Sequence, residues 1–180
     1  MLTTLPWLLP GIFVASILSA LLSAGAGRAF GVRQVVAWVL LVSLGVIIAA
    51  TLTPLRGAFA GDVGSGTCDL SRLGPASIDE LRTDRDAVLN ILIFVPFGFA
   101  IGLLPRGRRK AAVVALAIAL PFAIEAIQLL VPALARGCQS ADVADNLVGL
   151  MVGIAVGALV GPNVPAMRKH EEPTVSPTAD

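Results

Sequence analysis

Five long apolar runs divide the chain, and short polar segments separate them. The runs cover residues 7–26, 35–53, 86–104, 111–134 and 142–160. Each is close to the roughly 20 residues with which a helix crosses about 30 Å of hydrocarbon. The pattern predicts an all-α fold, a polytopic membrane helix bundle of about five transmembrane helices.

The first run also has a feature of a secretory signal peptide. Its small residues at positions 23–26 resemble a cleavage site. However, residues 1–6 contain no Lys or Arg, and the run is longer than the apolar region of an ordinary signal peptide. We therefore expect this run to be retained as a transmembrane helix.

The composition agrees with a membrane protein and excludes several other classes. Hydrophobic residues make up 56% of the 180 residues and charged residues 14%, whereas soluble domains have about 45–50% and about 25%. A soluble domain, a disordered chain, collagen and a disulfide-dense secreted scaffold are excluded. The net charge of +1 gives no electrostatic reason to expect nucleic acid as a partner, so the expected partners are membrane lipids.

Basic residues in the polar segments predict the orientation of the bundle. Short loops rich in Lys and Arg mark the cytoplasmic side, and residues 106–110 contain four such residues. With this cluster inside, the alternation of the loops places the N-terminus outside and the C-terminus inside. Eight of the 13 Lys and Arg residues then lie inside.

On this topology the chain has four parts. Two N-terminal transmembrane helices occupy residues 1–53, and an extracytoplasmic, water-exposed loop rich in Gly, Asp, Ser and Arg occupies residues 54–85. A three-helix core follows over residues 86–161. The polar tail, residues 162–180, is rich in Pro and Thr and is predicted to be disordered in the cytoplasm.

The two cysteines predict a covalent link between loops. Cys68 and Cys138 both lie in segments that this topology places outside the cytoplasm, where disulfides persist. Two cysteines allow only one intramolecular pair, and we expect that pair to clip the long loop over the ends of the fourth and fifth runs. Free thiols and a metal site are the alternatives, although no His lies nearby to complete a metal site.

Small residues and a proline predict close helix packing. Gly149, Gly153 and Gly157 recur every four residues in the fifth run, and this spacing leaves a groove for a neighbouring backbone. That neighbour is another helix of the bundle or a second protomer of a homo-oligomer. In the third run Pro96 removes an amide donor and Gly98 permits close approach, so we assign both to helix packing.

Polar side chains occur inside three of the apolar runs, where they are costly and usually face the bundle interior. Their spacing places those of each run on one helix face. With a rise of 1.5 Å per residue, all of them and a nearby arginine fall within roughly 10 Å of the outer surface. The predicted polar site consists of Asp86, Asn90, Glu125, Gln128, Arg136, Asp142, Asp145 and Asn146.

Three interpretations of this polar site are open. A structural network would pair Arg136 with Glu125 or Asp145 and fix which helices pack together. A binding pocket would take an amphiphile or its polar headgroup. Metal-assisted catalysis would use the acids to hold Mg²⁺ or Ca²⁺, so a divalent cation is the one cofactor left open, and no catalytic residue is assigned. We also expect Arg136 to fold inward onto Glu125, which is predicted to be the deepest acid.

Three stretches carry the polar residues of the predicted site: D-A-V-L-N-I-L-I-F-V-P-F-G (residues 86–98), E-A-I-Q (residues 125–128) and R-G-C-Q-S-A-D-V-A-D-N-L-V-G-L-M-V-G (residues 136–153). In their order and spacing they resemble the VanZ-like family of bacterial integral membrane proteins, in its actinobacterial branch. The resemblance covers about 70 of the 180 residues, and the first two runs carry no family signature that we identify. The family's recurring positions fall on Asn90, Pro96, Gly98, Glu125, Gln128, Arg136, Asp145, Asn146 and Gly149.

This resemblance implies a multi-pass protein of the bacterial cell membrane with a role in the cell envelope. The family's namesake is associated with low-level resistance to teicoplanin, a lipoglycopeptide that binds cell-wall precursors. We therefore expect an amphiphile, either a lipid-linked precursor or a lipoglycopeptide, to bind at the outer-leaflet polar site, with Phe94, Phe97 and Phe99 in the apolar lining. The alternatives are an enzyme acting on a lipid-linked phosphate or glycan, with Glu125 or Asp145 as base, and a structural partner of another membrane protein.

Overall fold

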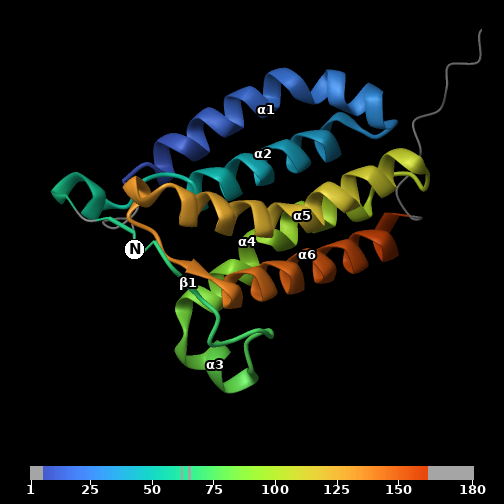
Figure 1. Cartoon of the computed structure of the whole chain (residues 1–180). Helices are drawn as coiled ribbons and strands as arrows, with labels where there is room; N and C mark the ends of the chain where they lie inside the picture. Colours follow the sequence, from blue (N-terminus) through green and yellow to red (C-terminus); the bar gives the residue numbers. More distant parts are fainter. Residues whose placement is uncertain (1–5, 62, 65, 162–180) are drawn as a thin grey trace, which may run out of the picture.

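The computed structural model describes residues 6–61, 63–64 and 66–161. Five long helices form a bundle (Figure 1), and each is long and apolar enough to cross a membrane. They are α1 (Leu8–Phe30), α2 (Gln34–Thr51), α4 (Arg85–Gly102), α5 (Arg108–Leu130) and α6 (Ser140–Val160). The predicted all-α membrane bundle is confirmed, whereas the tail that was predicted to be disordered lies outside the described residues.

The helix ends follow local signals in the sequence. α1 continues beyond its predicted end and stops at Gly31, whose φ of 68° is left-handed, a conformation that glycine adopts readily after a helix C-terminus. α5 stops at Leu130, short of its predicted end. Pro132 follows closely and has no amide hydrogen to donate, and the chain continues into the short helix η2 (Pro132–Leu134).

The long loop contains regular structure that the apolar pattern did not predict. It holds η1 (Arg56–Ala60), β1 (Cys68–Asp69) and α3 (Ile78–Thr83). A capping box starts α3, because Ser77 Oγ accepts from the Glu80 amide at 3.3 Å and the Glu80 carboxylate accepts from the Ser77 amide at 2.7 Å. The hydrogen bond from the Ser77 amide lowers the pKa of Glu80 below that of an ordinary glutamate. The cap is therefore fully formed above the ordinary glutamate pKa, and it is lost as the pH falls through the lowered pKa of Glu80.

Helices α4 and α6 form the most closely packed pair of the bundle. A Cβ atom at Gly149, Gly153 or Gly157 would collide with a backbone carbonyl of α4, and one at Gly98 would collide with the carbonyl of Leu150 in α6. The small residues therefore serve packing inside the bundle. The alternative in which the glycines join two protomers is wrong, because α4 already covers this face.

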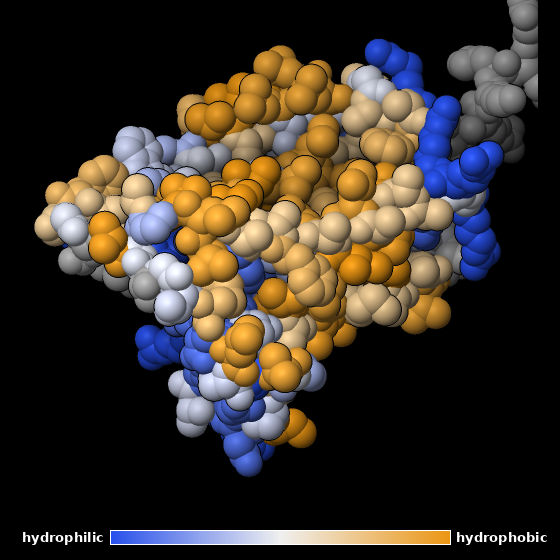
Figure 2. Space-filling model, viewed as in Figure 1, coloured by the Kyte–Doolittle hydropathy of each residue, from blue (hydrophilic) through white to orange (hydrophobic). Residues whose placement is uncertain are grey.

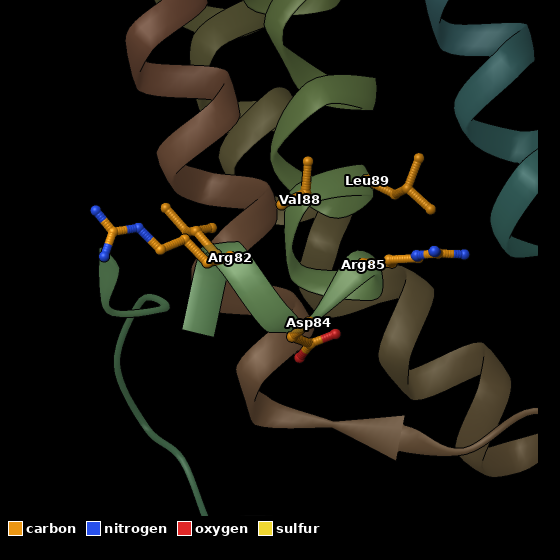
Figure 3. A pocket seen from close by; sticks show the side chains of 6 residues that line it. Arg82, Asp84, Arg85, Val88 and Leu89 are labelled. Carbon is orange, nitrogen blue, oxygen red and sulfur yellow. The ribbon is translucent and has the colours of Figure 1, made fainter. Parts of the chain in front are cut away.

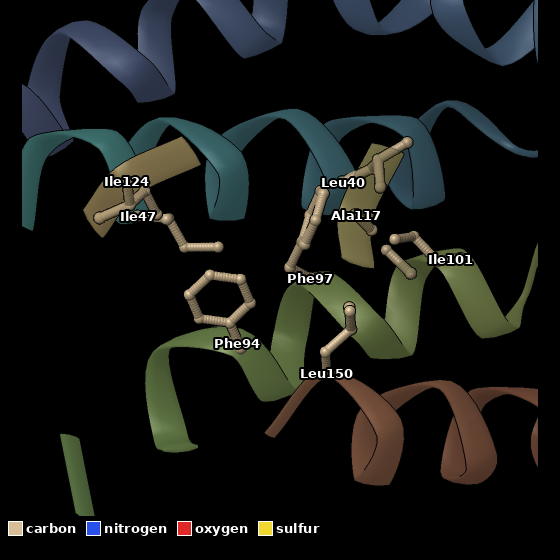
Figure 4. Packing of buried hydrophobic residues seen from close by; sticks show 9 residues of the cluster. Leu40, Ile47, Phe94, Phe97, Ile101, Ala117, Ile124 and Leu150 are labelled. Atoms are coloured by element: carbon tan, nitrogen blue, oxygen red, sulfur yellow. The ribbon is translucent and has the colours of Figure 1, made fainter. Parts of the chain in front are cut away.

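The apolar core lies among α2, α4, α5 and α6, where side chains from all four helices meet (Figure 4). The rings of Phe94 and Phe97 pack edge to face within it, with centroids 6.4 Å apart. Both rings are buried in this cluster and belong to the apolar core. Their expected place in the lining of a ligand site stays a prediction.

The flank of the bundle presents apolar side chains to its surroundings. Helix α1 packs mainly on α2 and keeps most of its apolar residues exposed. Figure 2 shows the flank mostly orange, with blue side chains at the right-hand end and on the projection at the bottom. An apolar flank between polar regions is the surface that a membrane-spanning bundle needs.

Candidate functional site at the loop-capped end

Two loops are joined over one end of the bundle, which we call the loop-capped end. A disulfide links Cys68 to Cys138, with 4.5 Å between their Cα atoms. The same residues begin β1 and β2 (Cys138–Gln139), which pair in parallel. Ser140 Oγ donates to the carbonyl of Arg72 at 2.7 Å. The predicted disulfide is present in the structure, and the long loop is fastened to the start of α6.

The disulfide gives a direct prediction for the protein in intact cells. We expect Cys68 and Cys138 both to resist a membrane-impermeant thiol reagent until reductant is added, because each sulfur is bonded to the other. Non-reducing electrophoresis with and without the reagent measures this. A Cys68→Ser variant should make Cys138 the only thiol, and ready labelling of either cysteine in the wild type would contradict the link.

Asp145 is the most completely buried acid of the predicted site. Its side chain has 0% exposure, and Arg72 binds both carboxylate oxygens, at 2.6 Å and 3.3 Å. The Ala76 amide donates to Asp145 Oδ1 at 2.8 Å. The expectation that Arg136 pairs with Asp145 is wrong, because an arginine of the long loop takes that place. The hydrogen bond to Asp145 raises the pKa of Arg72, so this guanidinium stays charged.

Arg136 does fold inward, as expected, but it does not meet an acid. It donates to the backbone carbonyls of Ala50 at 2.6 Å and Thr53 at 2.9 Å, and no ion pair in the described part of the chain includes it. Gln128 Nε2 donates to the carbonyl of Thr51 at 2.9 Å. Both side chains therefore cap the C-terminal end of α2, whose last carbonyls lack partners within the helix. The positive charge of Arg136 also stabilises the negative end of the helix dipole. Burial lowers the pKa of this guanidinium.

Glu125 is held by the backbone rather than by Arg136. Its Oε2 accepts a hydrogen bond from the Gln139 amide at 2.8 Å, so the predicted ion pair with Arg136 is wrong. The side chain is also not the deepest acid, since Glu125 is 5% exposed and Asp145 is 0% exposed.

A layer of polar residues lies one helical turn beyond the apolar core, toward the loop-capped end. Four core residues that pack together each have a polar residue four positions away on the same helix face. The pairs are Ile47 and Thr51, Phe94 and Asn90, Ile124 and Gln128, and Leu150 and Asn146. Figure 4 shows the side chains of Ile47, Ile124 and Phe94 close together at one end of the core and that of Leu150 near Phe97. The polar neighbour of each lies one turn nearer the loop-capped end. With Glu125, which adjoins Ile124, these polar residues form what we call the polar layer.

Asn146 has an unusual position in the polar layer. It is 1% exposed, and its Oδ1 atom is the one buried side-chain polar atom without a hydrogen bond in the described chain. Leaving a buried acceptor without a partner costs about 1–3 kcal/mol, so such an atom in a native fold needs an explanation. A hydrogen-bond donor on a bound molecule would supply one.

The other predicted residues lie nearer the surface. Asp86 is exposed at the start of α4, Asn90 is half-buried, and Asp142 is half-buried without a hydrogen bond to the described residues. Among the described residues no three His, Cys, Asp or Glu side chains are grouped so as to hold a metal ion. The polar layer therefore contains three side-chain amides, one threonine and a single carboxylate, that of Glu125.

The sequence interpretation missed three contributors to this end. Arg72 carried no signal beyond its charge, because no helical spacing connects a loop residue to α6. Thr51 and the Gln139 amide were missed because only side chains within three of the runs were considered. By contrast, α3 did have a sequence signal, because the S-x-x-E pattern that begins at Ser77 is typical of the start of a helix.

A family model described as VanZ/LLP1 matches residues 40–161, which is more than half of the chain. The chain belongs to the VanZ/LLP1 family. The VanZ match begins inside α2, so it extends beyond the predicted three-helix core and includes the end of α2 that Gln128 and Arg136 cap. Every member of the polar layer lies within the VanZ match. No curated protein and no solved structure matches this chain significantly.

Proposed function

We propose that this VanZ-family protein binds an amphiphile at the loop-capped end of its bundle, with the polar group of the ligand in the polar layer. The buried, unpartnered Oδ1 of Asn146 is the observation that carries the proposal. A hydroxyl or amide of the ligand donates to this atom, and the apolar chain of the ligand lies along the aliphatic flank. A lipid-linked cell-wall precursor and a lipoglycopeptide such as teicoplanin both have this chemistry.

The proposal places the loop-capped end outside the cytoplasm, at the outer leaflet of a bacterial cell membrane. A disulfide at this end supports that side, because disulfides persist outside the cytoplasm. The basic residues 106–110 follow α4 at the opposite end of the bundle, and such clusters mark the cytoplasmic side.

The contacts of the acids favour binding over catalysis. An enzyme of the kind considered above needs Glu125 or Asp145 as a base. Both already accept hydrogen bonds from the protein itself, Glu125 from a backbone amide and Asp145 from Arg72 and Ala76. The Asn146 acceptor has no such competitor.

Substitution of Asn146 by leucine tests this proposal. Asn146→Leu keeps similar bulk and removes the acceptor, so we expect the amount of co-purifying amphiphile to fall severalfold. The thermal stability of the ligand-free protein should stay equal or rise, because an unsatisfied buried polar atom has been replaced by an apolar group. Mass spectrometry of lipids extracted from the purified protein, together with thermal unfolding in detergent, measures both.

Ser19→Ala is the matched control, since Ser19 is a buried polar residue in α1, away from the polar layer. It should leave the co-purified amphiphile unchanged. A loss of stability in Asn146→Leu with unchanged amphiphile content would contradict the proposal and assign Asn146 to the structure alone.

A further inference from the structure

The segment of the long loop around α3 exposes large apolar side chains. Leu70, Leu73 and Ile78 are 63%, 79% and 72% exposed. Single exposed apolar residues are ordinary, but a group of them on one short segment marks a surface that meets a partner or a membrane. In Figure 1 this segment projects sideways from the bundle beside the first turns of α4 and α6.

α3 itself has an apolar face and a polar face. Ile78 and Leu81 are three residues apart and share one face. Asp79 and Arg82 share the other, where their side chains form an exposed ion pair at 3.3 Å. Figure 2 shows both kinds of surface on the projection, with orange along its right-hand side and blue at its lower tip. An amphipathic helix at a membrane surface lies in the plane of the interface, with its apolar face toward the acyl chains.

A shallow groove of about 210 Å³ lies between α3 and the start of α4. Leu81, Val88 and Leu89 supply its apolar surface. Asp84, Arg82 and Arg85 are its polar lining, and the two guanidinium groups extend toward opposite sides (Figure 3). Leu89, which lines the groove, and Leu92, three residues farther along α4 on the same helix face, are both exposed. The groove therefore opens at the level where a membrane-spanning helix enters the lipid.

The long loop is held in this position by buried contacts. The bond between Arg72 and Asp145 at 2.6 Å and the bond from the Ala76 amide fix the segment that precedes α3 to α6. Because α3 is followed at once by α4, both ends of the projection are attached to the bundle. Its apolar face is therefore presented at a fixed depth.

We propose that α3 lies in the outer-leaflet interface and that the groove between α3 and α4 takes an acyl chain of a membrane phospholipid. Leu70, Leu73 and Ile78 enter the lipid. Arg85 lies at the level of the phosphate groups, whose negative charge it complements, while Arg82 keeps its ion pair with Asp79. This changes the interpretation of residues 54–85 from a water-exposed loop to one that is partly inserted. The inference does not depend on ligand binding in the polar layer, because it uses none of the residues of that layer.

Fluorescence quenching of single tryptophans tests the placement. The two native tryptophans are first replaced (Trp7→Phe, Trp38→Phe), and a probe is then introduced in the full chain as Ile78→Trp, Val88→Trp or Asp79→Trp. The proteins are reconstituted in vesicles of phosphatidylcholine and phosphatidylglycerol that are brominated near the head end of the acyl chains. We expect bromolipid to quench the Ile78→Trp and Val88→Trp probes severalfold more than aqueous iodide does, and we expect the reverse for Asp79→Trp.

The outcomes separate the two parts of the proposal. Quenching of Ile78→Trp by iodide and not by bromolipid would overturn it, because α3 would then stand in water. Quenching by neither reagent would also overturn it, because another protein would then cover α3. Quenching of Ile78→Trp without quenching of Val88→Trp would overturn the occupation of the groove. Leu73→Trp provides a second probe if Ile78→Trp does not fold. The fold of every variant is checked by the disulfide between Cys68 and Cys138, which leaves no thiol to label in the folded protein.

Discussion

Arg72→Gln should lower the free energy of unfolding by about 3–5 kcal/mol, because it leaves the carboxylate of Asp145 buried without its cation. The carboxylate is fully buried, and the Ala76 amide is the one described contact that would remain. The long loop would also lose its attachment to α6. Thermal or denaturant unfolding in detergent measures the loss.

Two further variants make this result specific. Arg82→Gln removes an arginine of the same loop whose partner, Asp79, is exposed, so its effect should stay within about 1 kcal/mol. The double variant Arg72→Gln, Asp145→Asn removes the buried charge as well as its partner and should recover part of the stability. Asp145→Asn alone completes the cycle. A double variant that loses as much stability as Arg72→Gln and Asp145→Asn lose in sum would contradict a direct ion pair.

Gly153→Val should disrupt the contact between α4 and α6. The added side chain meets backbone atoms of α4 near Val95 and Phe99, which cannot move aside as a flexible side chain can. Overfilling a packed interior costs about 1–3 kcal/mol and sometimes more, and we expect the upper end of this range. Thermal unfolding and the folded fraction on size exclusion in detergent measure the effect.

Gly25→Val is the matched control, because it makes the same chemical change in a helix where a Cβ atom meets nothing within 4 Å. The helix propensities of valine and glycine differ by less than about 1 kcal/mol, so this variant should unfold close to the wild type. Equal stability of Gly153→Val and Gly25→Val would mean that α4 and α6 do not pack through this face.

The helices and the level of the polar layer could be predicted from the sequence because both depend on local regularities. The length of an apolar run predicts a membrane-spanning helix, and a rise of 1.5 Å per residue predicts the depth of each polar residue. Counting along the helices in this way placed Asn90, Glu125, Gln128 and Asn146 near one another. The structure places Asn90, Gln128 and Asn146 one turn beyond Phe94, Ile124 and Leu150, and it places Glu125 beside Ile124.

The partners of these residues could not be predicted, because they depend on the path of the loops. Arg72 precedes Asp145 by 73 residues, and its position follows from the attachment of the loop through Cys68 and β1. Arg136 was assigned to an acid because charge suggested it. Its actual acceptors are the carbonyls at the end of α2, and a sequence pattern does not show which backbone groups a helix end leaves unpaired.

Photocrosslinking from inside the polar layer tests the central claim most directly. A photoreactive amino acid is placed at position 90, which is half-buried one turn from Phe94, and in a second protein at position 19 of α1. After irradiation in cells, mass spectrometry identifies the adducts. The account predicts that position 90 captures a lipid-linked precursor, or the lipoglycopeptide when it is supplied, while position 19 does not. Ordinary phospholipid adducts at both positions, or no adduct at position 90, would contradict it.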